Sequence, residues 1–273
     1  MQAIAKSILL TLGLVSLQQS AICQDLTEQL RNEYTAVFNN TRANYTPEVF
    51  DKQITHLIIN ENSSCPVLYG LVQELATKLE MPTPQILIFK DPKAYNAFAM
   101  QPNRNDAGSI TICAGLITHP EHGATYNELK AVLAHELAHI KHQHLPKRVS
   151  RIIKGALFGC ASTAVALGVT YKLNPELYQK IAHSKAKIYG LGLIYSWIDQ
   201  TMFLKFCRSQ EKEADLTSAA VTQDPTSLIN FLDKADQMTK AEHPYLHKFF
   251  NTVPLTHPSH SDRTAYLKAL MPA

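Results

Sequence analysis

The stretch HELAHIKHQH, residues 135 to 144, constrains this chain most, because four histidines and one glutamate fall within a run of helical character that begins at Asn127. In a helix, side chains four residues apart share a face about one turn from each other. His135 and His139 have this spacing, so both imidazoles can reach one metal ion. Glu136 is offset by about 100° of rotation. It can therefore act as a base on water at the metal without ligating the metal.

The other two histidines fit this site less well. His142 shares the face but lies one turn further along. Pairing His142 with His139 would place Ile140, rather than a carboxylate, beside the first ligand. Continuing the same helix, His144 should point to the opposite side.

A third ligand is expected from RSQEKEAD, residues 208 to 215. Glu211 and Asp215 are four apart and share a face, so one can bind the metal while the other orients a ligand histidine. Glu213 lies about 200° round the helix and should point away. The alternative is a solvated face whose carboxylates pair with neighbouring Lys and Arg. HELAH upstream favours the metal-binding interpretation.

Five motifs occur in an order that carries a resemblance: NAFA at 96 to 99, ITICAGLI at 110 to 117, NELKAVLAHELAHIKHQH at 127 to 144, EKEAD at 211 to 215 and HPSHSDR at 257 to 263. Together they resemble the zinc metallopeptidases that include HtpX, the CAAX prenyl endopeptidases, OMA and BepA. The resemblance implies a gluzincin with one zinc ion per chain, held by His135, His139 and Glu211. Asp215 would then orient a ligand histidine.

The resemblance implies an α+β, mostly helical fold, with a small sheet next to the HExxH helix and a hydrophobic helical pair between HExxH and ExxxD. Two short runs, ILIF at 86 to 89 and ITIC at 110 to 113, have the composition of strands. Peptide substrates often bind by adding a strand to a sheet edge. ITIC is the candidate for that edge.

The hydrophobic pair is expected at residues 152 to 206, with apolar segments at 152 to 173 and 188 to 206. The first is marginal for a membrane span, and the second is interrupted by Asp199 and Gln200. A buried or membrane-surface hairpin and true insertion both remain open. Lys and Arg flank both segments on every side, so charge predicts no orientation.

The N-terminus has the layout of a secretory signal peptide, with one Lys, an apolar run and small residues before a cut near Cys23. We expect residues 1–23 to be the signal and 24–273 to be the catalytic domain, exported to the periplasm or held at a membrane. The formal charge is only +3, with no extended basic patch. Nucleic acid is therefore not expected as a partner.

Two functions from different classes follow. The resemblance implies a zinc endopeptidase that cleaves unfolded or mistargeted proteins of the cell envelope. The alternative is an envelope chaperone or assembly factor with a latent zinc site, although Glu136 favours catalysis because a structural site needs no base. In the resembling family, His257 and Arg263 lie at the cleft, where they contact the tetrahedral intermediate or the His covers the zinc.

Overall fold

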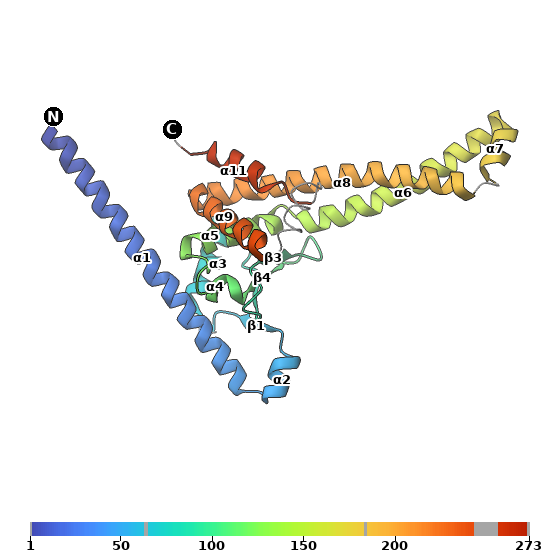
Figure 1. Cartoon of the computed structure of the whole chain (residues 1–273). Helices are drawn as coiled ribbons and strands as arrows, with labels where there is room; N and C mark the ends of the chain where they lie inside the picture. The colour runs from blue at the N-terminus through green and yellow to red at the C-terminus, as the bar shows by residue number, and fades with distance from the viewer. Residues whose placement is uncertain (1, 63–64, 183–184, 243–255, 272–273) are drawn as a thin grey trace.

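The computed structural model describes residues 2–62, 65–182, 185–242 and 256–271, and it is mostly helical around one small sheet (Figure 1). The predicted α+β class is confirmed. The helices are α1 (Gln2–Ala43), α2 (Pro47–Lys52), α3 (Pro66–Lys78), α4 (Ala114–Thr118), α5 (Tyr126–Lys141), α6 (His144–Leu173), α7 (Pro175–Ala182), α8 (Lys185–Thr222), α9 (Pro225–Glu242) and α11 (His260–Lys268). The strands are β1 (His56–Ile59), β2 (Gln85–Phe89), β3 (Ala97–Met100) and β4 (Ser109–Cys113).

The sheet has the strand order β1-β2-β4-β3. β2 and β4 are parallel, whereas β1 and β3 pair antiparallel on the outer sides. The prediction that ITIC forms the exposed edge is wrong, because β4 lies between two strands. Ile110 and Ile112 on one face and Thr111 on the other are all buried, as expected of an inner strand. The edge strand on the side of the HExxH motif is β3, from the NAFA motif.

The HExxH helix, α5, lies at the centre of the body against β3, α8 and α9. It begins with a capping box, in which the Thr125 hydroxyl accepts from the Glu128 backbone and the Glu128 carboxylate accepts from the Thr125 backbone. Its apolar side chains Leu133 and Leu137 are fully buried. Most of this helix is buried, and His135 and Glu136 are removed from water with it. Buried polar residues of this kind persist only with partners or a function.

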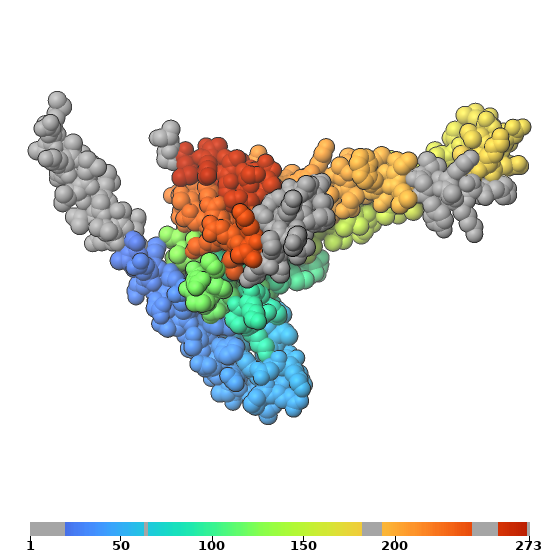
Figure 2. All heavy atoms as spheres, viewed as in Figure 1, coloured from blue at the N-terminus to red at the C-terminus, as the bar shows by residue number. Residues whose placement is uncertain are grey.

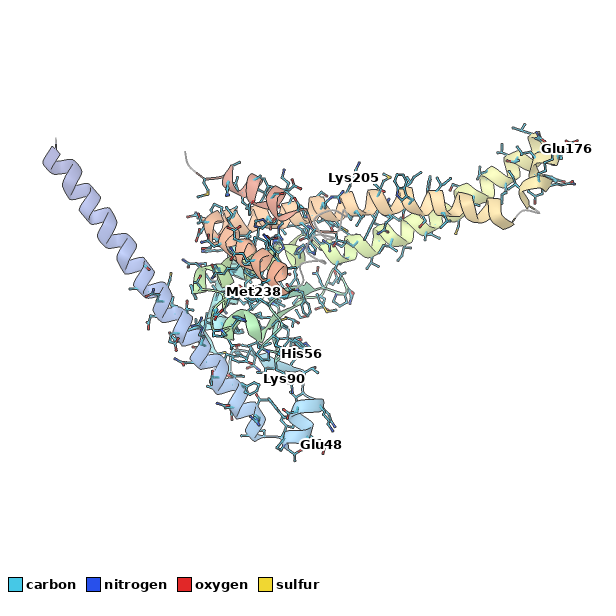
Figure 3. All side chains as sticks on the ribbon, in the orientation of Figure 1. Glu48, His56, Lys90, Glu176, Lys205 and Met238 are labelled. Atoms are coloured by element: carbon cyan, nitrogen blue, oxygen red, sulfur yellow. The ribbon has the colours of Figure 1, made fainter. Side chains whose placement is uncertain are left out.

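The predicted helical pair forms a hairpin that projects from the body (Figure 2). We use "the hairpin" for α6, α7 and residues 185–206 of α8. Figure 3 places Glu176 at its far tip and Lys205 near the body. Arg151 Nη2 lies 2.9 Å from Asp199 Oδ1, and the Tyr195 hydroxyl donates to the Gly155 carbonyl at 2.5 Å. These contacts join the two arms side by side.

Beyond residue 151, most of the large apolar side chains described on the hairpin face outward rather than into the body. Leu157, Phe158 and Trp197 are 66%, 68% and 72% exposed. Among the residues that the structure describes, α6 is long and apolar enough to cross a membrane, and 6% of its most apolar stretch is buried. The hairpin is therefore not packed beneath the catalytic domain, which was one of the expected arrangements.

The N-terminal helix, α1, continues without a break through the predicted signal cleavage site at Cys23. Its later part packs on the core through Leu30, Tyr34 and Val37. Removal of residues 1–23 stays a prediction.

Candidate metal centre

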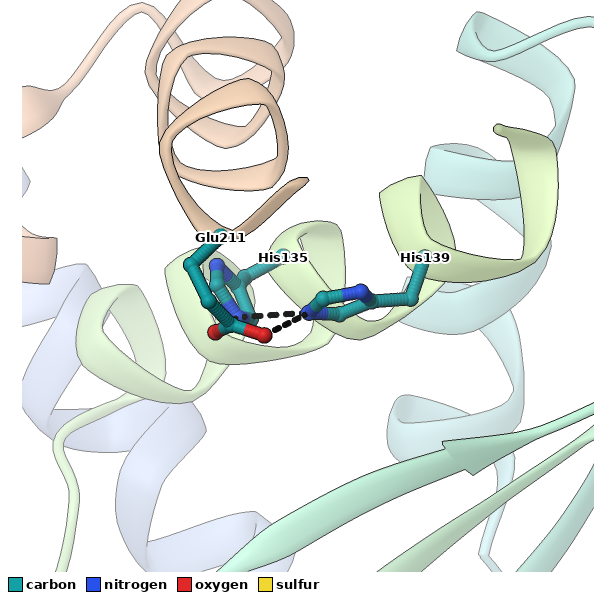
Figure 4. Close-up of side chains that lie close together, drawn as sticks. All are labelled: His135, His139 and Glu211. Atoms are coloured by element: carbon teal, nitrogen blue, oxygen red, sulfur yellow. Dashed lines mark hydrogen bonds and ion pairs between the residues drawn. The ribbon is translucent and has the colours of Figure 1, made fainter. Parts of the chain in front are cut away.

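Three side chains from two helices meet beside the sheet, His135 and His139 from α5 and Glu211 from α8 (Figure 4). The Nε2 atoms of the two histidines are 3.1 Å apart. Glu211 oxygens lie 3.7 Å from His135 Nε2 and 3.6 Å from His139 Nε2. One ligand atom from each residue lies within 4.8 Å of the other two. The structure thus brings together the three residues that the sequence predicts as ligands.

The residues present fit a divalent metal ion. Two imidazole nitrogens and a carboxylate oxygen are donors typical of zinc and related metals. Glu211 is 1% exposed and its two ring neighbours are mostly buried. A cation shared by these atoms would compensate for removing them from water.

Asp215 lies behind His135, one turn after Glu211 on α8. Its Oδ1 is 2.8 Å from His135 Nδ1, the ring nitrogen that faces away from the cluster. Arg263 donates to both Asp215 oxygens at 2.8 and 2.6 Å, and the Tyr266 hydroxyl also contacts this carboxylate. Burial alone would raise the pKa of Asp215, but His135 and Arg263 hold it well below its usual value. Arg263 lines the cavity, yet both of these hydrogen bonds go to Asp215.

His144 was expected to point to the opposite side of α5, and this prediction is wrong. α5 ends at Lys141, and Gln143 has φ of 53°, a left-handed conformation that starts a new helix direction. His144 therefore turns back, and its Nδ1 lies 2.7 Å from His139 Nδ1. Pro146 could have predicted this new helix start, because Pro is favoured in the first turn of a helix and disfavoured in its interior.

Glu213 was expected to point away from the metal site, and its side chain is neither part of the cluster nor on the lining of the cavity beside it; it lies against the histidines that follow HELAH. Its Oε2 lies 3.0 Å from His144 Nε2, and its Oε1 lies 3.4 Å from His142 Nδ1. Burial lowers the pKa of His144 to about 4. Despite partial burial, the hydrogen bond from His144 and the nearby histidines lower the pKa of Glu213, which stays a carboxylate.

Glu136 lies on the same cavity as the cluster and is 9% exposed. Burial raises the pKa of Glu136 to about 7, and the backbone N–H of Ala99 on β3 opposes this shift by donating to the carboxylate. A carboxyl group whose pKa lies near neutrality is suited to taking and returning a proton. The free edge of the sheet thus meets the expected base directly.

The cavity measures about 310 Å³ and is lined by β3 on one side and by α5, α6 and α8 on the other. His257 lies at its mouth, with its Nδ1 2.7 Å from Glu211 Oε2 and its side chain 59% exposed.

Arg148, which the sequence reasoning missed, donates to Glu211 Oε1 at 2.7 Å. Burial would raise the pKa of Glu211, but the neighbouring His135 and the hydrogen bond with His257 keep it well below its usual value. Phe98, Leu228 and Phe231 supply an apolar wall.

Comparison with known proteins identifies the family. Residues 66–271 match the model of peptidase family M48. The chain is 29% identical over 228 residues to the Protease HtpX homolog of Methylibium petroleiphilum strain PM1, covering 77% of this chain and 76% of that protein. It is 28% identical over 225 residues to the Protease HtpX homolog of Burkholderia mallei strain SAVP1, covering 76% and 75%.

The crystal structure of S. mikatae Ste24p is 14% identical with a TM-score of 0.46; the match covers 94% of this chain and 64% of that one. The family match is the finding that decides membership, since it spans most of the chain and includes both HELAH and EKEAD. The chain belongs to peptidase family M48 and is a metalloprotease.

Proposed function

We propose that this metalloprotease is a zinc-dependent endopeptidase in which His135, His139 and Glu211 hold one zinc ion and Glu136 is the catalytic base. The observation that carries the proposal is the meeting of all four side chains in one cavity beside a free strand edge. When bound, zinc supplies a Lewis acid that polarises a carbonyl and makes water nucleophilic near neutral pH.

The chain's own residues supply binding, orientation and proton transfer. An extended peptide adds to the outer edge of β3, which orients its backbone along the cavity. Glu136 takes a proton from the attacking water and passes it to the leaving amine. Asp215 orients His135, and Arg263 fixes Asp215 in place.

His257 has two candidate roles, and its contact with Glu211 supports both. As a donor at the cavity mouth it can stabilise the developing oxyanion. As a neutral imidazole it can cover the metal and keep the enzyme latent. The second role supports the alternative function, a chaperone or assembly factor with a latent zinc site.

The substrate class that we propose is unfolded or mistargeted protein of the cell envelope. A strand edge accepts only extended chain, which folded proteins rarely offer. The predicted signal peptide and the exposed hairpin support export and attachment to a membrane. Exposed apolar side chains on a projecting hairpin would be covered by lipid.

The test is Glu136→Gln in purified full-length protein. We expect bound zinc to stay near one per chain while casein cleavage falls at least about 100-fold, because a base is lost and no ligand is. Glu121→Gln is the matched control, since that side chain is 81% exposed. Retained cleavage in Glu136→Gln would remove this residue from the mechanism, and a wild-type protein without zinc would refute the metal assignment.

A further inference from the structure

The two expected ligand histidines have different partners at Nδ1, the ring nitrogen that faces away from the metal cluster. Nδ1 of His135 faces the carboxylate of Asp215, an ordinary acceptor for a metal-bound histidine. Nδ1 of His139 instead faces another ring nitrogen, Nδ1 of His144, at 2.7 Å. At this distance one nitrogen must carry the hydrogen and the other must accept it.

The far side of His144 decides which nitrogen donates. Its Nε2 lies 3.0 Å from Glu213 Oε2, and a carboxylate can only accept. Nε2 of His144 therefore carries the hydrogen. In a neutral imidazole the other nitrogen then has a free lone pair, so Nδ1 of His144 accepts. His144 is 1% exposed, and burial disfavours the doubly protonated cation.

The consequence reaches His139. Because Nδ1 of His139 must donate to His144, its Nε2 is left with a lone pair, and this lone pair points at His135 Nε2 and Glu211. We propose that His144 is a positioning residue that selects the metal-binding tautomer of His139, and that Glu213 sets the tautomer of His144. This inference rests on the proposed zinc site.

We use "the relay" for the hydrogen-bonded series Glu213, His144 and His139. The residues around it include a second histidine near Glu213. His142 also lies against Glu213, with its Nδ1 3.4 Å from Oε1, while its Nε2 lies 3.1 Å from the Thr217 hydroxyl. The Thr217 hydroxyl donates to the Glu213 backbone carbonyl, so it accepts from His142. His144 makes the shorter contact with this carboxylate, at 3.0 Å, and it is the more buried of the two rings.

The experiment measures the zinc dissociation constant of the full chain by competition with a chromophoric chelator. Substitutions at position 144 test the acceptor. Asn carries its amide oxygen at the position of Nδ1, whereas Gln carries its amide near the position of Nε2. We expect His144→Leu and His144→Gln to weaken zinc binding about 10- to 100-fold. His144→Asn should stay within about fivefold of wild type, because it restores the acceptor for His139.

Substitutions at position 213 test the direction. Glu213→Gln keeps an acceptor for His144 and should change zinc affinity less than about fivefold. Glu213→Lys offers a donor instead, which turns the His144 ring into the wrong tautomer and should weaken binding about 10- to 100-fold. Added positive charge alone would also weaken binding. In a protein that already carries His144→Leu, Glu213→Lys should therefore lower zinc affinity much less, because there is no longer an imidazole at position 144 whose tautomer it could change.

The outcomes separate this inference from the proposed function. Absence of zinc in the wild-type chain refutes the zinc site itself. Normal zinc affinity in His144→Leu, or equal loss in His144→Asn and His144→Leu, refutes the positioning role while leaving the site intact. Thermal midpoints of the metal-free variants show whether each has folded. As a second readout, nitrogen NMR of the zinc-loaded wild type should show the His144 hydrogen on Nε2 and none on its Nδ1, and a hydrogen on Nδ1 of His144 would overturn the relay.

Discussion

At the scale of single residues, the strongest constraint around the site is a buried ion pair. Asp215 is fully buried, Arg263 is 13% exposed, and two hydrogen bonds of 2.8 and 2.6 Å join them. Removing one partner of such a pair leaves an unpaired charge in the interior, which costs far more than removing both. This pair therefore links the C-terminal helix α11 to the carboxylate that lies 2.8 Å from His135 Nδ1.

We expect Asp215→Asn to lower the free energy of unfolding of the metal-free protein by about 3–5 kcal/mol, because the Arg263 cation stays buried without its partner. The double variant Asp215→Asn/Arg263→Met should lose less than the sum of the two single variants. Denaturation in urea would measure this. Additive losses would show that the two side chains are not energetically coupled.

The same pair has a pH dependence with a definite sign. The pKa of Asp215 is depressed in the folded chain, so its stabilising effect is complete above the ordinary carboxyl value of about 4 and declines as pH falls below it. The difference in stability between wild type and Asp215→Asn should therefore shrink in acid.

Helical phase predicted part of the site correctly. It placed His135 and His139 on one face, and it put Glu211 and Asp215 together, as the structure has them. It failed for His144 because one unbroken helix was assumed through Gln143. Helical spacing predicts the direction of a side chain only within one continuous helix. A single residue with positive φ ends that helix and changes the direction of the side chains that follow. Arg148 was missed because its contact with Glu211 joins residues 63 positions apart.

At the scale of elements, the turn between α5 and α6 decides how the site is completed. Gln143 alone reverses the direction of the chain, with φ of 53° and ψ of 43°. Non-glycine residues adopt this conformation at a cost of about 1 kcal/mol or more, and branched side chains at a higher cost. The turn delivers both His144 and Arg148 from α6 to side chains of the cluster.

Gln143→Gly should leave zinc affinity and thermal stability close to wild type, because glycine adopts positive φ readily. Gln143→Val should destabilise the protein by about 1–2 kcal/mol and weaken zinc binding, because a branched side chain resists this conformation. Differential scanning calorimetry and chelator competition would measure the two effects. Equal behaviour of the two variants would show that the turn is not strained.

Sheet order was the least predictable part of the fold. ITIC was recognised as a strand by its β-branched residues, but composition does not show which strand lies at the edge. β3 was not predicted, since AFAM is short and two of its four residues are alanine. Its position depends on pairing with β4, a tertiary contact that overrides weak local preference.

At the scale of the whole molecule, the hairpin and the catalytic body form two unlike surfaces. The hairpin presents large apolar side chains to its surroundings, whereas the body buries its own around α5 and the sheet. α6 has 30 residues, a length of about 45 Å, which exceeds the roughly 30 Å of a bilayer core. Two basic residues near its base, Arg151 and Lys154, suit the headgroup region.

The triple variant Leu157→Ser/Phe158→Ser/Trp197→Ser should bind neutral phosphatidylcholine vesicles at least about tenfold more weakly than wild type, because it removes exposed apolar area from the hairpin. The matched control Tyr45→Ser/Ile58→Ser/Leu270→Ser removes apolar residues exposed on the body. It should bind as wild type does. Cosedimentation with vesicles would measure both, and equal loss in the two variants would count against attachment through the hairpin.

One continuous helix, α8, carries both Trp197 and Glu211. Glu211 follows Trp197 by fourteen positions, a rise of about 21 Å along a rigid rod. With the hairpin seated in a bilayer as proposed, this rod acts as a ruler that holds the cleft at a set height above the lipid. The height of a peptide bond above the membrane then becomes a criterion for cleavage, in addition to the side chains around that bond. A substrate is selected by how far its unfolded chain extends from the membrane surface.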